Sequence, residues 1–311
     1  MMGEPIVVFR NAQGRAYALE DRCCHRGVQL SLGSITAAGS LACRYHGWEY
    51  DGGGRCVHVP SLCTGTPVPE GFRVRSYPCI EQEHYVWVWM REGPPTVAAP
   101  AAIPGAGEHA WRQGTVEVAC SADLMLDNIL DSSHIPFVHV GTHWAYFLNR
   151  MSGFKEYEYE VRLTEPGLVV FYPPVADAQT PHQEHAASYL QFDLPDRVTV
   201  FQRGVKNSFF LVIHLVRTGE FHSRVEWPMR QREGGHGAEW LGDENVTLQQ
   251  DGVILESAQR NYRDFGADFE RSVPADFPLL SSRKIVSLAR AGRWASDRSS
   301  LTQRKLVLVR Q

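Results

Sequence analysis

Several features of other protein classes are missing from this 311-residue sequence. No apolar run approaches the roughly 20 residues that a membrane-spanning helix needs, and the N-terminus lacks the charged-then-apolar pattern of a secretion signal. Positive charge is not in excess, since the formal net charge is -4, which gives no reason to expect nucleic acid or an anionic membrane as a partner. The sequence therefore predicts a cytoplasmic protein without a nucleic-acid or membrane partner.

A disulfide framework and a dinucleotide-binding loop are also missing. The seven cysteines are odd in number and irregularly spaced, which argues against a disulfide framework and suits a reducing compartment where thiolates can bind metal. No Gly-rich dinucleotide-binding fingerprint follows a predicted strand. Any reaction driven by NAD(P)H would therefore need a separate reductase.

Two short segments near the start of the chain each combine cysteine with histidine. Residues 23–25 are Cys-Cys-His, and residues 43–46 are Cys-Arg-Tyr-His. This division suits a Rieske [2Fe-2S] cluster, in which two thiolates hold one iron and two imidazoles hold the other. A Cys2His2 zinc site is the alternative, but zinc fingers usually place both cysteines together and both histidines together. The predicted cluster ligands are Cys23, His25, Cys43 and His46.

A second group of candidate metal ligands lies further along the chain. Asn128, Asp131 and His134 recur at every third residue, which predicts that they share one face of a helix. Pro136 interrupts helical hydrogen bonding and can turn the imidazole of His139 toward that of His134. Two neutral imidazoles beside acidic residues suit a divalent transition metal.

This second group still needs a carboxylate if it is to hold a mononuclear iron. Two histidines and one carboxylate occupy one face of such an iron and leave the opposite positions open. Asp251, Asp243 and Glu244 are the candidates, and Asp251 is favoured because its segment, an aspartate before an apolar run, resembles a segment of the family described below. The predicted iron ligands are His134, His139 and Asp251.

Composition divides the chain into two domains joined by a linker. Short β-branched and aromatic runs, including residues 6–9 and 85–90, predict an all-β first domain. A Pro/Ala-rich stretch follows and is typical of an interdomain linker. We expect the first domain to span residues 1–95, the linker 96–110 and the second domain 111–311.

Strand-like and helical patterns are mixed in the second domain. Helices are predicted at residues 121–131, with Ser121 as the N-cap, and at about 238–265. A basic segment over residues 294–305 is also expected to be helical. Strands are predicted at residues 115–118, 157–163, 168–172, 188–194, 198–202 and 209–216. The pattern predicts an α+β domain with an antiparallel sheet and flanking helices.

These segments resemble those of the Rieske non-haem iron oxygenases. Residues 21–27 and 43–48 are similar to the two cluster-binding loops of that family, and residues 126–139 with Asp251 are similar to its iron-binding segments. The resemblance is closest to single-subunit monooxygenases and demethylases, and it implies a helix-grip catalytic domain after the Rieske domain. Cys24 stands where the family commonly has proline. Fewer residues precede the first loop than in the family, so the first domain is expected to be short at its N-terminus.

The resemblance also implies a function. Such an enzyme uses O2, and electrons that a ferredoxin or flavin reductase takes from NAD(P)H, to hydroxylate or oxidatively demethylate a small, largely apolar cyclic substrate. Asp131 would connect the two centres by hydrogen-bonding to His134 and to His46 of a neighbouring subunit in a homotrimer. Asn128 would belong to the same catalytic segment. Aromatic-ring cis-dihydroxylation, or electron transfer without a catalytic iron, remains an alternative.

Overall fold

The computed structural model describes most of the chain in two compact units, residues 1–103 and 104–311. The described residues are 4–82, 85–91, 93–95, 109–139, 156–173, 188–203, 208–232 and 244–310. Most of the predicted linker lies outside these ranges. No helix within them is both long and apolar enough to cross a membrane.

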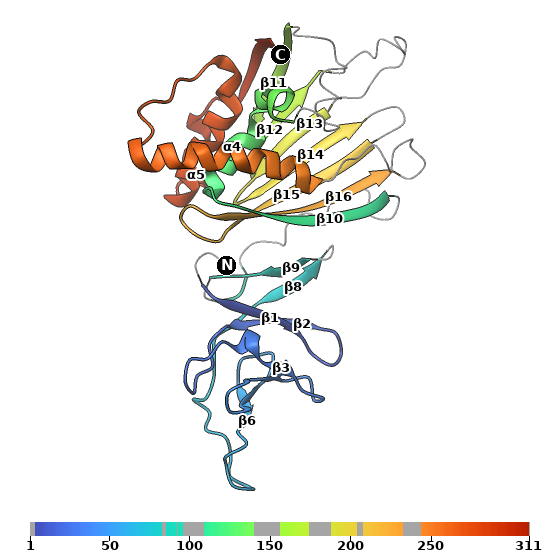
Figure 1. Cartoon of the computed structure of the whole chain (residues 1–311), viewed down its shortest axis with the longest axis vertical. Coiled ribbons are helices and arrows are strands. Elements are labelled where there is room, and N and C mark those ends of the chain that lie inside the picture. Colours follow the sequence, from blue (N-terminus) through green and yellow to red (C-terminus); the bar gives the residue numbers. More distant parts are fainter. Residues whose placement is uncertain are drawn as a thin grey trace. The chain divides into compact units, whose positions relative to one another are not determined.

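Small antiparallel sheets build the first unit (Figure 1). One sheet has the order β1-β2-β7, from Ile6–Arg10, Ala16–Glu20 and Ser76–Tyr77. A second has the order β3-β4-β5-β6, from Ser34–Ile35, Leu41–Ala42, Glu49–Tyr50 and Cys56–His58. Strands β8 (Cys79–Gln82) and β9 (Tyr85–Val88) form a hairpin, and a 3-10 turn, η1, spans Leu30–Leu32. The side chains of Leu19, Leu30 and Tyr50 are completely buried, so the core of this unit lies directly beneath the predicted cluster loops.

An eight-stranded antiparallel sheet forms the second unit, with the order β10-β16-β15-β14-β13-β12-β11-β17 (Figure 1). The strands are β10 His109–Val118, β11 Glu156–Leu163, β12 Gly167–Tyr172, β13 Ser188–Asp193, β14 Arg197–Arg203, β15 Ser208–Arg217, β16 Ser223–Arg232 and β17 Arg304–Arg310. Leu168, Val170 and Phe192 are fully buried in the hydrophobic core of this unit.

Helices α4 (Glu244–Phe265) and α5 (Phe277–Arg290) lie on one face of this sheet (Figure 1). Helix α1 (Ala122–Leu130) packs against both of them and against β15. Ser121 is its N-cap, as predicted, because the Ser121 hydroxyl accepts a hydrogen bond from the Leu124 amide. A β domain followed by an antiparallel sheet with flanking helices confirms the predicted α+β fold class.

Strand β16 was not predicted, and Pro228 lies in its middle. Buried Val225, Trp227 and Met229 alternate with Arg224 and Glu226, which is the pattern of a strand with one buried face. Proline lacks the N–H that a central strand needs, and the pairing of β15 with β16 skips residues 227 and 228 accordingly.

The predicted C-terminal helix is mostly wrong. Only α6 (Trp294–Asp297) and the short 3-10 turn η4 (Arg298–Ser300) are helical, and the chain then forms β17. Val307 is buried while Leu306 and Leu308 are exposed, so the segment alternates as a strand does. Pairing with β11 along seven residues outweighs the helical tendency of the basic sequence. Helix α5 was also missed in the sequence.

Candidate metal centres

The two predicted cluster loops form the same kind of turn. In each, the cysteine carbonyl accepts a hydrogen bond from the amide four residues later, at 2.9 Å. The cysteine amide donates to the carbonyl five residues later, at 2.8 Å. Gly27 and Gly47 close the turns with φ of 75° and 69°, a left-handed conformation that favours glycine. In each loop, main-chain hydrogen bonds thus close a ring of backbone atoms that begins at the cysteine, Cys23 in one loop and Cys43 in the other.

The four predicted cluster ligands lie together. Cys23 and Cys43 are each 3% exposed and hydrogen-bond to one another, and burial is the main reason that the pKa of the Cys43 thiol is raised. The rings of His25 and His46 have centroids 4.7 Å apart. His25 Nδ1 is buried and has no hydrogen-bond partner in the described part of the chain. Two buried thiols and two imidazoles, one with an orphaned ring nitrogen, fit a [2Fe-2S] cluster.

Aromatic residues support this ligand set. Trp48 stacks on His25 with ring centroids 4.5 Å apart and on Phe72 with centroids 5.0 Å apart. The Tyr50 hydroxyl lies 3.1 Å from Cys23 Sγ and 3.3 Å from Cys24 Sγ. Burial, and then these hydrogen bonds, raise the pKa of Tyr50, so its phenol stays protonated and can donate to sulfur. All seven cysteines of the chain are free thiols.

The segment carrying the other predicted ligands is broken at Asp131 rather than continuously helical. Helix α1 ends at Leu130, and the Asp131 carboxylate accepts a hydrogen bond from the Ser133 amide at 2.8 Å. Asp131 thereby caps a 3-10 turn, η2 (Ser132–His134), which the short helix α2 (Ile135–Val138) follows. Pro136 lies in the first turn of α2, where proline is tolerated, and so does not cause the break. The predicted single helix face is therefore wrong, although its residues remain close together.

Asp251 on α4 meets both histidines. Its Oδ1 atom lies 3.3 Å from Nε2 of His134 and 3.3 Å from Nε2 of His139, and the two Nε2 atoms are 3.2 Å apart. Asp251 is 4% exposed, and its Oδ1 has no well-formed hydrogen bond among the described residues. A buried acceptor without a donor costs about 1–3 kcal/mol, a cost that a cation would remove. Two imidazoles and one orphaned carboxylate oxygen fit a mononuclear iron.

The remaining ring nitrogens have oxygen acceptors. His134 Nδ1 contacts the main-chain carbonyl of Asp131, and His139 Nδ1 lies 3.1 Å from Gln250 Oε1. Both rings are therefore held as Nδ1–H tautomers with Nε2 free for a metal. Burial lowers the pKa of His139. Burial also opposes protonation of His134, but Asp251 and Asp131 outweigh it, and the pKa of His134 is raised.

Other predicted residues have different surroundings. Asn128 is half-buried on α1, and its Nδ2 has no hydrogen-bond partner among the residues described. Glu244 is buried at the start of α4, and its charge only partly opposes the lowering of the His139 pKa by burial; it is not in the group of three close ligand atoms. Asp243 lies outside the described residues. Of the three candidate carboxylates, Asp251 is the one that the structure places beside both imidazoles.

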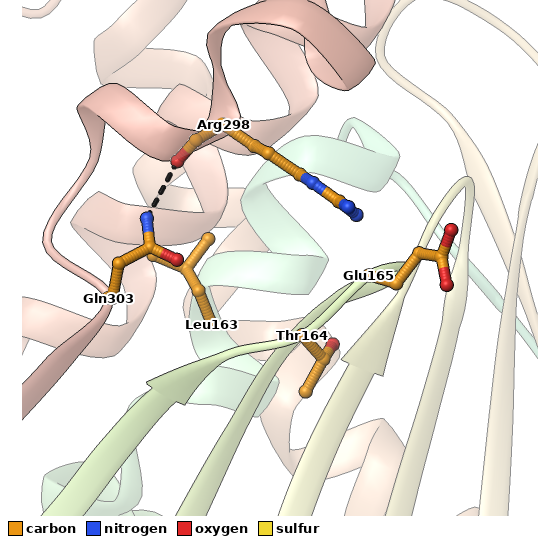
Figure 2. A pocket seen from close by; sticks show the side chains of 5 residues that line it. All are labelled: Leu163, Thr164, Glu165, Arg298 and Gln303. Carbon is orange, nitrogen blue, oxygen red and sulfur yellow. Dashed lines mark hydrogen bonds between the residues drawn. The ribbon is translucent and has the colours of Figure 1, made fainter.

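A separate pocket of about 230 Å³ opens on the second unit (Figure 2). The residues after β11 and those around η4 line it, and Gln303 Nε2 donates a hydrogen bond to the Arg298 carbonyl at 2.8 Å. Its lining residues are Leu163, Thr164, Glu165, Arg298 and Gln303. None of them belongs to either group of predicted metal ligands.

Known proteins match both units. Residues 1–78 match the Rieske [2Fe-2S] domain, and residues 118–198 match the vanillate O-demethylase oxygenase C-terminal domain. A chloroplastic chlorophyllide a oxygenase of Chlamydomonas reinhardtii is 38% identical over 143 residues, which cover 46% of this chain and 21% of that protein. The oxygenase component of dicamba O-demethylase from Stenotrophomonas maltophilia is 39% identical over 144 residues, covering 45% of this chain and 41% of that protein.

A solved structure also has the same fold. The structure of dicamba monooxygenase bound to dicamba superimposes with a TM-score of 0.72 at 23% identity, covering 94% of this chain and 91% of that one. At this identity the likeness establishes the fold alone, and the matched segment spans less than half of each curated relative described above. Since a Rieske domain precedes an oxygenase C-terminal domain, the chain belongs to the Rieske non-haem iron oxygenases, and its cofactors are a [2Fe-2S] cluster and a mononuclear iron.

Proposed function

We propose that the protein is the terminal oxygenase of a monooxygenase system that hydroxylates or oxidatively demethylates a small, largely apolar cyclic molecule with O2. The observation that carries this proposal is the buried group of His134, His139 and Asp251. An electron carrier would need the cluster loops but not a second set of metal ligands. Similarity to proteins named as demethylases, including dicamba O-demethylase, supports the same reaction class.

In the proposed mechanism, His134, His139 and Asp251 would hold the iron that reacts with O2. When bound, the iron supplies oxygen activation and the cluster delivers electrons one at a time. The Asp131 carbonyl keeps a proton on Nδ1 of His134, so that Nε2 is the metal-binding atom. Asp251 supplies the negative charge that partly balances the cation.

Electrons are proposed to come from a ferredoxin or flavin reductase that oxidises NAD(P)H, because the chain has no recognisable dinucleotide-binding loop. His46 is exposed in the first unit, and Asp131 is half-buried in the second. We propose that they meet across the interface of a cyclic homotrimer, where Asp131 links the cluster of one subunit to the iron of the next.

The first experiment is to count iron and acid-labile sulfide on anaerobically purified protein. The proposal predicts about three irons and two sulfides per chain, because the cluster holds two of each. His134→Ala should lose one iron and retain the cluster spectrum. If His134→Ala keeps its full iron and Glu244→Gln loses one, then the ligand assignment is wrong.

Turnover would then be tested with a reductase and a panel of methoxylated aromatics, beginning with vanillate and dicamba, which the names of similar proteins suggest. Formaldehyde released in proportion to O2 consumed would establish demethylation. A cis-diol product from an unsubstituted aromatic would favour dihydroxylation instead. Reduction of the cluster with no O2 consumption across the panel, in protein with three irons, would count against the proposed substrate class.

A further inference from the structure

Two consecutive residues of α4 contact the two nitrogens of one imidazole. Asp251 Oδ1 lies 3.3 Å from His139 Nε2, and Gln250 Oε1 lies 3.1 Å from His139 Nδ1. The same turn of the helix thus supplies a candidate metal ligand and an acceptor for the opposite nitrogen of the neighbouring ligand. His139 is 3% exposed, so little solvent reaches the ring to replace this acceptor.

We propose that Gln250 is a positioning residue of the iron site. Its amide carbonyl accepts the Nδ1 proton of His139 and so fixes the ring with a bare Nε2 toward the metal. The inference rests on the proposed iron site of His134, His139 and Asp251. It adds a residue that touches neither iron nor substrate and acts through His139 alone.

The acceptor at residue 250 is a neutral amide oxygen rather than a carboxylate. The other imidazole, that of His134, also meets a neutral acceptor, the main-chain carbonyl of Asp131. The Asp251 carboxylate, in contrast, faces the Nε2 atoms of both rings. Neutral acceptors therefore orient both rings without adding negative charge beside the candidate metal ligands.

Gln249 provides a matched control. It precedes Gln250 on the same helix and has the same side chain, but it is exposed while Gln250 is half-buried. Methionine keeps the length and helix propensity of glutamine and lacks its amide acceptor. Gln250→Met therefore removes the proposed hydrogen bond, and Gln249→Met makes the same chemical change where no contact with His139 exists. Gln250→Glu restores an acceptor oxygen in nearly the same shape.

The test measures ferrous iron affinity of the full chain with its cluster intact, by anaerobic competition with a coloured chelator. We expect Gln250→Met to weaken iron binding by about 10- to 100-fold, the usual effect of losing an acceptor behind a metal-bound histidine. Gln249→Met should bind as the wild type does, and Gln250→Glu should lie closer to the wild type than to Gln250→Met. Cluster absorbance and melting temperature in every variant establish that the fold is retained.

A second readout is the EPR signal of the nitric oxide adduct of the ferrous site, recorded with the cluster oxidised and EPR-silent. Its line shape should change in Gln250→Met and return toward the wild type in Gln250→Glu. Equal iron affinity in Gln250→Met and Gln249→Met, or an equal loss in both, would overturn the role of Gln250. If His134→Ala binds iron as tightly as the wild type, the proposed iron site fails as well, so the two failures are distinguishable.

Discussion

Arg283 on α5 connects α1 to the segment that follows α4, and its replacement should destabilise the second unit. Its Nε and Nη2 atoms donate to Asp127 Oδ2 at 2.9 and 2.7 Å, and its Nη1 and Nη2 atoms donate to the Glu270 carboxylate at 2.7 Å each. The side chains of Asp127, Glu270 and Arg283 are 13%, 26% and 35% exposed. Asp127 immediately precedes Asn128, so this contact also holds the end of α1 that leads to the proposed iron ligands.

The expected cost follows from this partial burial. Removing one partner of a fully buried ion pair costs about 3–5 kcal/mol, whereas exposed pairs contribute about 0–1 kcal/mol. With Asp127 mostly buried and Arg283 one-third exposed, we expect Arg283→Leu to lower the free energy of unfolding by about 2 kcal/mol at pH 8. The loss should come mainly from the Asp127 carboxylate that is left without its cation.

The pH dependence of this loss has a definite sign. Burial outweighs the attraction of Arg283 and raises the pKa of Asp127 to about 6, above its usual range. Without Arg283 this pKa must rise further, so the carboxyl takes up a proton as the pH falls and the penalty shrinks. The destabilisation caused by Arg283→Leu should therefore be smaller at pH 5.5 than at pH 8.

Urea unfolding monitored by tryptophan fluorescence would measure both effects, with Asp127→Asn and the double variant completing a thermodynamic cycle. Arg290→Leu is the control, because Arg290 pairs with Asp123 on the same two helices while both side chains are about half exposed, at 55% and 46%. That variant should lose no more than about 1 kcal/mol. If Arg283→Leu and Arg290→Leu have the same stability at pH 8, the argument from burial is wrong.

Three further changes test other parts of the molecule. Asp131→Asn should retain both metals and the cap on Ser133, since asparagine caps as well as aspartate, but should nearly abolish coupled turnover; normal turnover would exclude a bridging role. Tyr50→Phe removes a donor to Cys23 Sγ and should lower the cluster reduction potential by on the order of 50 mV in a redox titration, whereas an unchanged potential would mean that this bond is not made to the cluster. Burial, assisted by the charge of Arg197, lowers the pKa of His214 to about 4. Because the unfolded chain binds this proton more readily, the free energy of unfolding should fall as the pH drops from 6.5 toward 4, by about 3 kcal/mol at most. His214→Gln should reduce this loss in urea unfolding at pH 7 and 4.5, and parallel losses in both proteins would contradict it.

Local patterns in the sequence were sufficient for the features that depend on neighbours along the chain. Ser121 was identified as an N-cap from its place before an apolar run, and the alternation in residues 157–163 identified β11. The Asp131 break had a local signal too, since aspartate before two serines favours a capped turn over a continuing helix. The regular three-residue spacing of Asn128, Asp131 and His134 concealed that signal.

Features that depend on distant pairing could not be found in this way. Gln250 lies 111 residues after His139, and its hydrogen bond to that ring exists only once α4 has folded against the segment that carries His139. Strand β17 depends on β11 at the edge of the sheet, and β16 contains a proline that makes an isolated segment look unsuitable as a strand. In each case, tertiary contacts decide between conformations that the local sequence leaves nearly balanced.

The closed hydrogen-bond rings of the two cluster loops have an evolutionary consequence. Each ring is completed by main-chain atoms, so the exposed side chains of Arg26 and Arg44 do not close it, whereas the Tyr45 ring packs against that of His46 with centroids 3.7 Å apart. Residues 26 and 44 can therefore vary in charge and size while Cys23 and Cys43 keep their places. A lineage could change the charge of this exposed surface without having to rebuild the backbone that positions the two cysteines.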